Sequence, residues 1–201
     1  PARYLSHKNL VSLFQRLFTR REIPLRYTEG FNPKPKLEFA HALSLGVESY
    51  DEIATLFLDK NFSPDEFLAR CNSSLPEGMR FTRAAFLEFP PGVKSTMSYY
   101  WGSEYRLALP KDEKSLIALS RDLFGPYLTE EYSREGRVTF ELLYPEGEPT
   151  LKGIGRRLRA ESTEYPELIE LTRLKSLFKS ADSTGIPFPW PDSSSDPSAQ
   201  V

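Results

Sequence analysis

The chain has 201 residues, enough for one large domain or two small ones, and its 26 Lys and Arg against 28 Asp and Glu give a net charge of −2. That balance excludes a nucleic-acid binder that is basic over its whole surface, although a local basic patch is compatible with it. The single cysteine excludes a disulfide framework and any Cys-rich zinc or iron–sulfur site in this chain. No apolar run approaches the ~18–20 residues that cross a bilayer and no signal peptide is visible, so we expect a cytoplasmic protein that does not bind membranes.

The first half of the sequence predicts two helices and several short strands. Apolar residues recur at helical spacing over residues 10–18, with Ser6 as the N-cap and Pro24 as the residue that ends the helix. A Ser-Pro-Asp-Glu run predicts the start of a second helix, over residues 63–74. Strands or extended segments are predicted at residues 25–28, 37–40, 43–47, 53–58 and 79–89.

The second half alternates strands and helices. A strand is predicted at residues 104–109, a helix at 114–124 and a further strand at 138–144. The apolar spacing favours a last short helix at 167–178. The remaining residues, 180–201, are rich in Ser, Pro and Asp, and we predict that this tail is disordered.

The order of these elements predicts an α+β protein. If one further strand precedes Pro1, the first half has the βαββαβ order of a ferredoxin-like unit, which is a sheet with both helices on one face. We therefore predict a ferredoxin-like domain at residues 1–90 whose first strand is missing from this sequence, a second and smaller α+β subdomain at residues 98–179, and the disordered tail.

The uneven distribution of charge suggests contact with phosphate. Residues 1–47 hold 8 Lys and Arg against 3 Asp and Glu, whereas residues 48–79 hold 2 against 7. A second basic cluster stands in a stretch with two glycines and comprises Lys152, Arg156, Arg157 and Arg159. Backbone amides freed by glycines and several cations suit phosphate or RNA; the alternative is ordinary solvated charge.

The loop Glu-Gly-Phe-Asn-Pro-Lys-Pro-Lys at residues 29–36 is the strongest candidate for a binding surface. Gly30 permits a positive φ, and the two prolines restrict the unbound loop, so its side chains are held ready to bind. An exposed Phe31 can stack on a base while a neighbouring lysine holds a phosphate. The alternative is a rigid turn in which Phe31 fills the core. The loop residues proposed for binding are Glu29, Gly30, Phe31, Asn32, Lys34 and Lys36.

Few residues in this sequence could carry catalysis or bind a metal. His7, at the start of the first helix, could act as an acid or base near a phosphodiester, or could have no chemical role, and His41 has no evident partner. Cys71 lies on the apolar face of its helix, which indicates a buried, inert thiol. The spacing of these residues and of the acids fits no metal site, so we assign neither catalytic residues nor metal ligands.

Several short motifs follow one another within about the first 110 residues. They are Arg-Tyr-Leu-Ser-His at residues 3–7, the loop at 29–36, Leu-Gly-Val-Glu-Ser at 45–49 and Leu-Pro-Glu-Gly at 75–78. In order and spacing they resemble the radical SAM-linked protein family. Members of that family occur fused to, or encoded beside, a radical SAM protein of the cobalamin-binding type, and often beside ribosomal and RNA-processing genes.

The resemblance implies an accessory, non-catalytic protein that recognises an RNA or ribosomal substrate for a separate radical SAM enzyme. The iron–sulfur cluster, S-adenosylmethionine and cobalamin are expected on that partner, because iron–sulfur chemistry needs clustered cysteines. Arg3, Ser6 and His7 join the loop in the expected recognition surface. Two alternatives stay open: an RNA-processing or RNA-modifying enzyme on a ferredoxin-like scaffold that uses His7, and a module that binds only other proteins.

Overall fold

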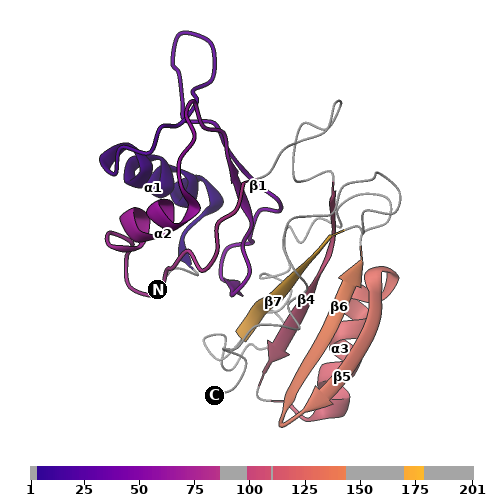
Figure 1. Cartoon of the computed structure of the whole chain (residues 1–201). Coiled ribbons are helices and arrows are strands. Elements are labelled where there is room, and N and C mark those ends of the chain that lie inside the picture. The colour runs from indigo at the N-terminus through magenta and orange to yellow at the C-terminus, as the bar shows by residue number, and fades with distance from the viewer. Residues whose placement is uncertain (1–3, 87–98, 110, 144–169, 179–201) are drawn as a thin grey trace.

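The computed structural model describes residues 4–86, 99–109, 111–143 and 170–178, and within these ranges the chain is a mixed α+β protein, as the sequence predicts (Figure 1). The helices are α1 (His7–Arg20), α2 (Pro64–Asn72), α3 (Glu113–Phe124) and the short 3-10 helix η3 (Gly125–Tyr127). The strands are β1 (Leu37–Phe39), β2 (Glu48–Ser49), β3 (Ala54–Leu56), β4 (Tyr100–Ala108), β5 (Leu128–Arg134), β6 (Arg137–Leu143) and β7 (Glu170–Phe178). They form a two-stranded sheet, β1-β3, and a five-stranded sheet in the order β2-β7-β4-β6-β5.

Helices α1 and α2 lie side by side next to the two-stranded sheet (Figure 1). Helix α1 begins where the sequence predicts, because the Ser6 hydroxyl accepts a hydrogen bond from the backbone N–H of Asn9 at 3.2 Å. Its apolar face contributes Phe18 to a core that also contains Phe67 and Cys71 of α2. Burial of these side chains explains why both predicted helices form.

The five-stranded sheet carries the second core, and α3 covers one of its faces (Figure 1). In the antiparallel ladder of β4 and β6, Tyr105 stands opposite Phe140 and Leu107 opposite Val138. The α3 side chains Leu116, Leu119 and Phe124 belong to the same buried cluster. The predicted helix at 114–124 and the predicted strands at 104–109 and 138–144 are therefore confirmed, the last as far as Leu143.

A short segment from the first half of the sequence completes this sheet. Strand β2 pairs in parallel with β7, with Glu48 opposite Thr172 and Ser49 opposite Arg173. The Tyr50 N–H then donates to the Arg173 carbonyl at 3.0 Å. Val47, just before β2, is buried in the core of the five-stranded sheet. The two halves of the sequence therefore share one sheet.

The helix predicted at residues 167–178 is wrong, because residues 170–178 form strand β7. Leu171, Leu174 and Leu177 recur every three residues, and this spacing favours a helix. In the structure β7 lies between β2 and β4. Three successive residues from 171 to 173 are buried, so the alternation that identifies a half-exposed strand is absent.

Three other sequence predictions need correction. The strand expected at 79–89 is not formed over residues 79–86, and residues 87–89 lie outside the described ranges. The extended segment at 43–47 contains a turn, in which Gly46 takes a φ of 88°. The strand at 25–28 is reduced to isolated bridges at Leu25 and Tyr27. Each segment lacks the continuous partner strand that a ladder requires. The tail at 180–201 also lies outside the described ranges.

Candidate functional site

Residues 25–36, called the hairpin below, reach away from α1, α2 and the two-stranded sheet (Figure 1). Tyr27 and Pro35 form an antiparallel bridge, and the Thr28 N–H donates to the Lys34 carbonyl at 2.9 Å. The Thr28 hydroxyl accepts in return from the Lys34 N–H at 3.1 Å. Gly30 has a φ of 120°, which few residues other than glycine adopt, at the turn between the two arms. Local hydrogen bonds therefore fix the base of the hairpin and leave its tip in solvent.

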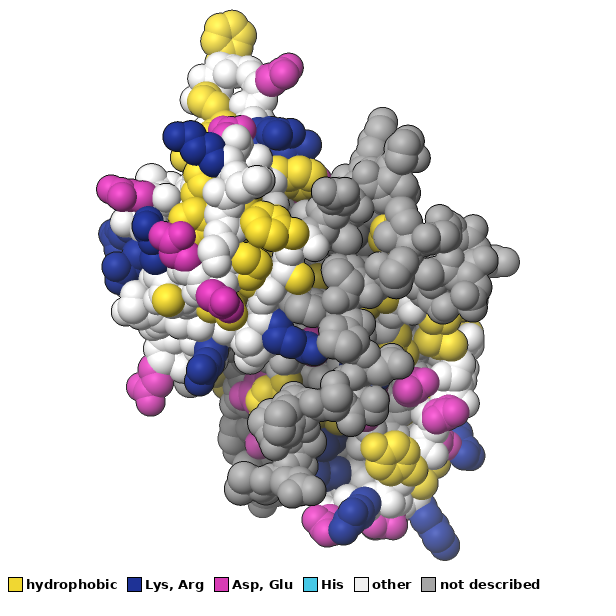
Figure 2. All heavy atoms as spheres, viewed as in Figure 1, with side chains coloured by type: hydrophobic (Ala, Val, Ile, Leu, Met, Phe, Trp, Pro, Cys, Tyr) yellow, Lys and Arg dark blue, Asp and Glu magenta, His cyan; other side chains and the backbone are white. Residues whose placement is uncertain are grey.

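The hairpin displays aromatic rings and cations together. Phe31 is exposed over 106% of its reference area and Tyr27 over 46%, so the alternative in which Phe31 fills the core is wrong. Figure 2 shows a hydrophobic side chain at the outermost tip, with Lys and Arg side chains nearer the base. The ammonium of Lys36 lies 4.2 Å above the ring of Phe57, and Arg26 pairs with Asp59 at 3.4 Å. Lys34 is exposed.

The other sequence-predicted site residues are not gathered at the hairpin tip. Ser6 caps α1, and the ring of His7 meets the ring of Phe39 edge to face, with centroids 5.2 Å apart. Arg3 and the second basic cluster lie outside the described residues. The cluster members are Lys152, Arg156, Arg157 and Arg159. Of the residues expected to form the recognition surface, the structure therefore brings together only the six in the loop at 29–36.

A cavity of about 900 Å³ lies beside the two-stranded sheet. Its lining includes Phe14 and Phe18 of α1, residues 53–60 around β3, and residues 78–86. His7 and Glu52 also contribute to the lining. The lining therefore combines apolar side chains of α1 with two stretches of consecutive residues.

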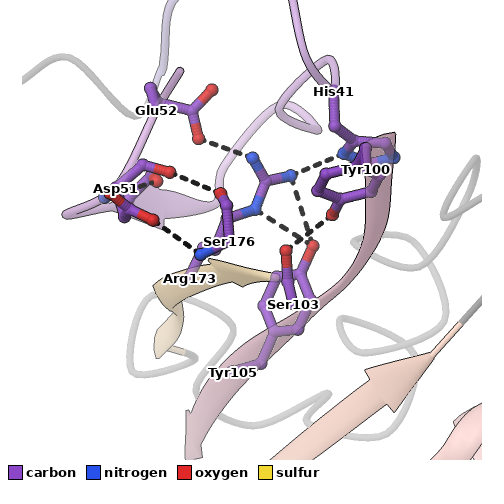
Figure 3. A network of polar contacts seen from close by, with 9 residues as sticks. His41, Asp51, Glu52, Tyr100, Ser103, Tyr105, Arg173 and Ser176 are labelled. Atoms are coloured by element: carbon purple, nitrogen blue, oxygen red, sulfur yellow. Dashed lines mark hydrogen bonds and ion pairs between the residues drawn. The ribbon is translucent and has the colours of Figure 1, made fainter. Parts of the chain in front are cut away.

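A buried arginine with three polar partners joins the first half of the sequence to the five-stranded sheet (Figure 3). Arg173, 1% exposed, donates from Nη1 to Glu52 Oε1 at 2.6 Å and lies 2.7 Å from His41 Nδ1 through Nη2. Its Nε and Nη2 each lie 3.3 Å from the Tyr105 hydroxyl. We call His41, Glu52, Tyr105 and Arg173 the arginine cluster. Sequence analysis missed it.

The protonation states of the arginine cluster follow from these contacts. A guanidinium only donates hydrogen bonds, so His41 accepts with Nδ1 and carries its proton on Nε2. Burial, with a further contribution from the positive charge of Arg173, lowers the pKa of His41 to about 4. Burial raises the pKa of Glu52, and the Arg173 charge opposes that rise. This geometry therefore fits a neutral His41 beside an ion pair between the Glu52 carboxylate and the Arg173 guanidinium.

Further bonds beside the arginine cluster hold the same segment in place. Asp51 accepts the Ser176 N–H through Oδ2 at 2.7 Å, and its carbonyl accepts the Ser176 hydroxyl at 2.7 Å. The ring of His41 stacks on that of Tyr100 at 4.8 Å between centroids. With so many partners and little exposure, the arginine cluster fastens residues 41–52 to β4 and β7. It positions the chain rather than presenting a reactive group.

Three further observations concern possible metal, thiol and membrane sites. In the described ranges no group of three His, Cys, Asp or Glu side chains could hold a metal ion. Cys71 is buried, and burial raises the pKa of its thiol to about 11, in keeping with the inert thiol predicted. None of the helices that the structure describes has the length and apolarity to span a bilayer.

The described fold defines a mixed α+β protein that combines a small two-helix unit with a five-stranded sheet. A family described as "Uncharacterized protein conserved in bacteria (DUF2344)" matches residues 1–134, and the chain belongs to this family. The match includes the hairpin, the lining of the cavity and three members of the arginine cluster, His41, Glu52 and Tyr105. It ends before β6 and β7. No curated protein and no solved structure matches the chain.

Proposed function

We propose that this protein recognises a single-stranded stretch of an RNA or ribosomal substrate through the hairpin, and that a separate radical SAM enzyme carries out the chemistry. The observation that carries the RNA part is the full exposure of Phe31 at the tip of a hydrogen-bonded hairpin. The radical SAM part rests on the resemblance of the motifs at residues 3–7, 29–36, 45–49 and 75–78 to the radical SAM-linked protein family.

The chemistry of the hairpin suits single-stranded RNA. A fully exposed ring adds no buried area to the fold, whereas a base stacked on it contributes about 1–3 kcal/mol of binding energy. Residues 25–36 carry Arg26, Lys34 and Lys36 against Glu29, which is three positive charges against one negative. These cations can follow a phosphate backbone. The bridge between Tyr27 and Pro35 holds the arms together before binding, so little order is lost on association.

Any iron–sulfur step belongs to another polypeptide under this proposal. Such a cluster is held by several cysteine thiolates, and this chain has one cysteine. Cys71 of α2 is buried in the core that α2 shares with α1, and its thiol pKa of about 11 disfavours the thiolate that binds iron. The cluster, S-adenosylmethionine and cobalamin would therefore be held by the partner enzyme.

The proposal is tested by measuring RNA affinity over a salt series. Unstructured RNA oligonucleotides labelled with a fluorophore are titrated with the wild-type protein, with Phe31→Ala and with Lys34→Ala. Phe31→Ala should weaken binding about 5- to 150-fold at every salt concentration, which is the range that the loss of one stacked base implies. Lys34→Ala should weaken it and lower the slope of log K against log salt by about 0.7, the value for one phosphate contact on a single strand.

Matched controls separate a hairpin effect from a general one. Tyr132 on β5 is 59% exposed and Lys114 on α3 is also exposed, so Tyr132→Ala and Lys114→Ala remove an aromatic ring and a cation elsewhere. Both should bind RNA as the wild type does. Equal affinity of all four variants, or no binding above background, overturns the proposal and leaves the hairpin as a surface for another protein. Loss of RNA turnover with retained binding in His7→Ala would instead identify an RNA-modifying enzyme.

A further inference from the structure

Strand β5 forms one edge of the five-stranded sheet. Among the strands that the structure describes, it pairs with β6 and with no other. An edge strand of this kind offers its outer backbone groups to another chain, and many proteins prevent such pairing with prolines or lysines on the edge. Residues 128–134 contain neither. The ladder with β6 is irregular between Leu128 and Glu130 and regular over residues 130–134, so a regular edge is available for pairing.

The turn after β5 determines which of its backbone groups point outward. Arg134 precedes a two-residue turn, in which Glu135 and Gly136 have φ values of 53° and 71°. Positive φ at both central residues is typical of a type I′ hairpin, whose flanking residues are hydrogen-bonded to each other. The N–H and C=O of Arg134 therefore face β6. Successive residues alternate, so the N–H and C=O groups of Glu131 and Ser133 face outward.

The side chains of β5 divide between the two faces of the sheet. Glu131 and Ser133 each form a side-chain hydrogen bond with α3, both at 3.1 Å. By alternation, the side chains of Glu130, Tyr132 and Arg134 lie on the face opposite α3. All three of these residues are exposed, so the edge presents an aromatic ring flanked by one acid and one base.

A two-fold axis at Tyr132 makes two β5 strands complementary to each other. In the antiparallel register centred on this residue, Glu131 of one copy stands opposite Ser133 of the other, so their outward N–H and C=O groups bond each other. The two Tyr132 residues form a non-hydrogen-bonded pair, in which side chains lie closest together. Glu130 of each copy stands opposite Arg134 of the other, which places opposite charges face to face at two symmetric positions.

Charge disfavours the neighbouring registers. An axis at Glu131 would place this residue opposite its own copy, and an axis at Ser133 would bring Glu131 to Glu135, and like charges directly opposite each other are destabilising. Arg134 is free to pair across the axis at Tyr132, because its ion pair with Glu135 in its own chain is weak. That pair spans 3.4 Å and joins two side chains that are 83% and 71% exposed.

We propose that this protein forms a two-fold symmetric dimer in which the β5 strands of two copies pair antiparallel, centred on Tyr132. The two five-stranded sheets then form one continuous sheet, and each copy covers the exposed edge of the other. The inference goes beyond RNA recognition and does not depend on it, because the hairpin and β5 lie far apart (Figure 1). Tyr132→Ala should therefore weaken the dimer and leave the affinity for RNA unchanged.

Sedimentation velocity over a range of protein concentrations measures the association. The wild-type protein should shift from monomer to dimer as the concentration rises. Ser133→Pro removes the outward N–H and should weaken the dimer about 10-fold or more, whereas Ser133→Ala also loses the bond to α3 but keeps the N–H and should dimerise as the wild type does. Circular dichroism checks that both variants fold. A wild type that is monomeric throughout, or equal association of the two variants, overturns the proposal.

A pair of charge reversals tests the register without a proline. In the proposed dimer Glu130→Arg places two cations opposite each other and Arg134→Glu places two anions opposite each other, so each variant alone should associate about 10-fold or more weakly than the wild type. Their equimolar mixture restores opposite charges at both positions and should form a heterodimer with nearly the wild-type affinity.

A mixture with the wrong cation reversed serves as the matched control. Arg137 on β6 is exposed and lies outside the proposed pairing, so Glu130→Arg mixed with Arg137→Glu should stay weakly associated. Equal association of the single variants and of both mixtures overturns the proposal. A dimer that survives both reversals at the wild-type affinity uses another surface, which overturns it as well.

Discussion

Replacing His41 by asparagine should flatten the pH dependence of stability between pH 6.5 and 4. In the folded protein His41 is buried against Arg173, and both burial and that charge lower its pKa to about 4. In the unfolded chain its pKa returns to the ordinary histidine value of 6.5. Between these values the unfolded state binds a proton that the folded state does not, so the free energy of unfolding falls as the pH falls. Asparagine keeps an oxygen near the position of Nδ1 to accept from Arg173 and cannot titrate.

The size of the effect follows from the difference between the two pKa values. The interval from 6.5 to about 4, at roughly 1.4 kcal/mol for each pKa unit, corresponds to about 3 kcal/mol. This stabilisation is fully present above pH 6.5 and is lost as the pH falls toward 4. The wild type should therefore lose about 3 kcal/mol more than His41→Asn between pH 7 and pH 4.

Urea denaturation followed by circular dichroism at several pH values measures this difference. The protein has two histidines, which provides a matched control. His7→Asn retains His41 and should keep the steep acid dependence of the wild type, whereas His41→Asn should lose it. Parallel curves for the wild type and His41→Asn would refute the argument, because they would show that His41 takes up its proton equally easily in both states.

Two further predictions concern the arginine cluster and the ladder between β4 and β6. Glu52→Gln leaves the buried Arg173 without a counter-charge, and Glu52 itself is 23% exposed, so the free energy of unfolding should fall by about 3 kcal/mol. Calorimetry should then show a melting temperature lower by roughly 6–12 °C, whereas Glu130→Gln on the exposed face of β5 should change it little. Gly102→Ala would bring a Cβ within 2.0 Å of the Leu142 carbonyl, so urea titration should show the fold destabilised by about 2 kcal/mol or more. Gly125→Ala has open space around its Cβ and should be almost neutral. Equal urea midpoints for the two variants would contradict the close approach at Gly102.

The elements that the sequence predicts correctly are those whose signals are local. The capping serine before α1, the Ser-Pro start of α2 and the apolar stripe of α3 all lie within a few residues of the helix that they specify. The protruding loop at 29–36 belongs to the same class, because glycine and proline constrain the backbone where they stand. β5 was missed because its sequence, Leu-Thr-Glu-Glu-Tyr-Ser-Arg, contains no apolar run.

The arginine cluster had no local signal. Arg173 is 121 residues from Glu52 and 132 residues from His41 in the sequence. An arginine in a segment with helical apolar spacing gives no indication that it will be buried, and it is the pairing of β7 with β2 and β4 that brings it to its partners. His41 and Glu52 do lie close in sequence to the motif at 45–49, but this proximity does not predict that their partner is Arg173.

The incorrect strand prediction at residues 79–86 has a physical explanation. Residues 79–86 carry a sequence that favours a strand, yet a strand exists only when a neighbour supplies hydrogen bonds along its edge. Among the residues that the structure describes, no strand pairs with residues 79–86. The N–H of Phe81 instead donates to Asn72 Oδ1 of α2 at 2.8 Å, and its carbonyl accepts from Asn72 Nδ2 at 2.9 Å. The stretch is therefore held by a side chain of α2 rather than by a ladder, and its residue types could not reveal this, because they do not determine whether a partner strand lies alongside.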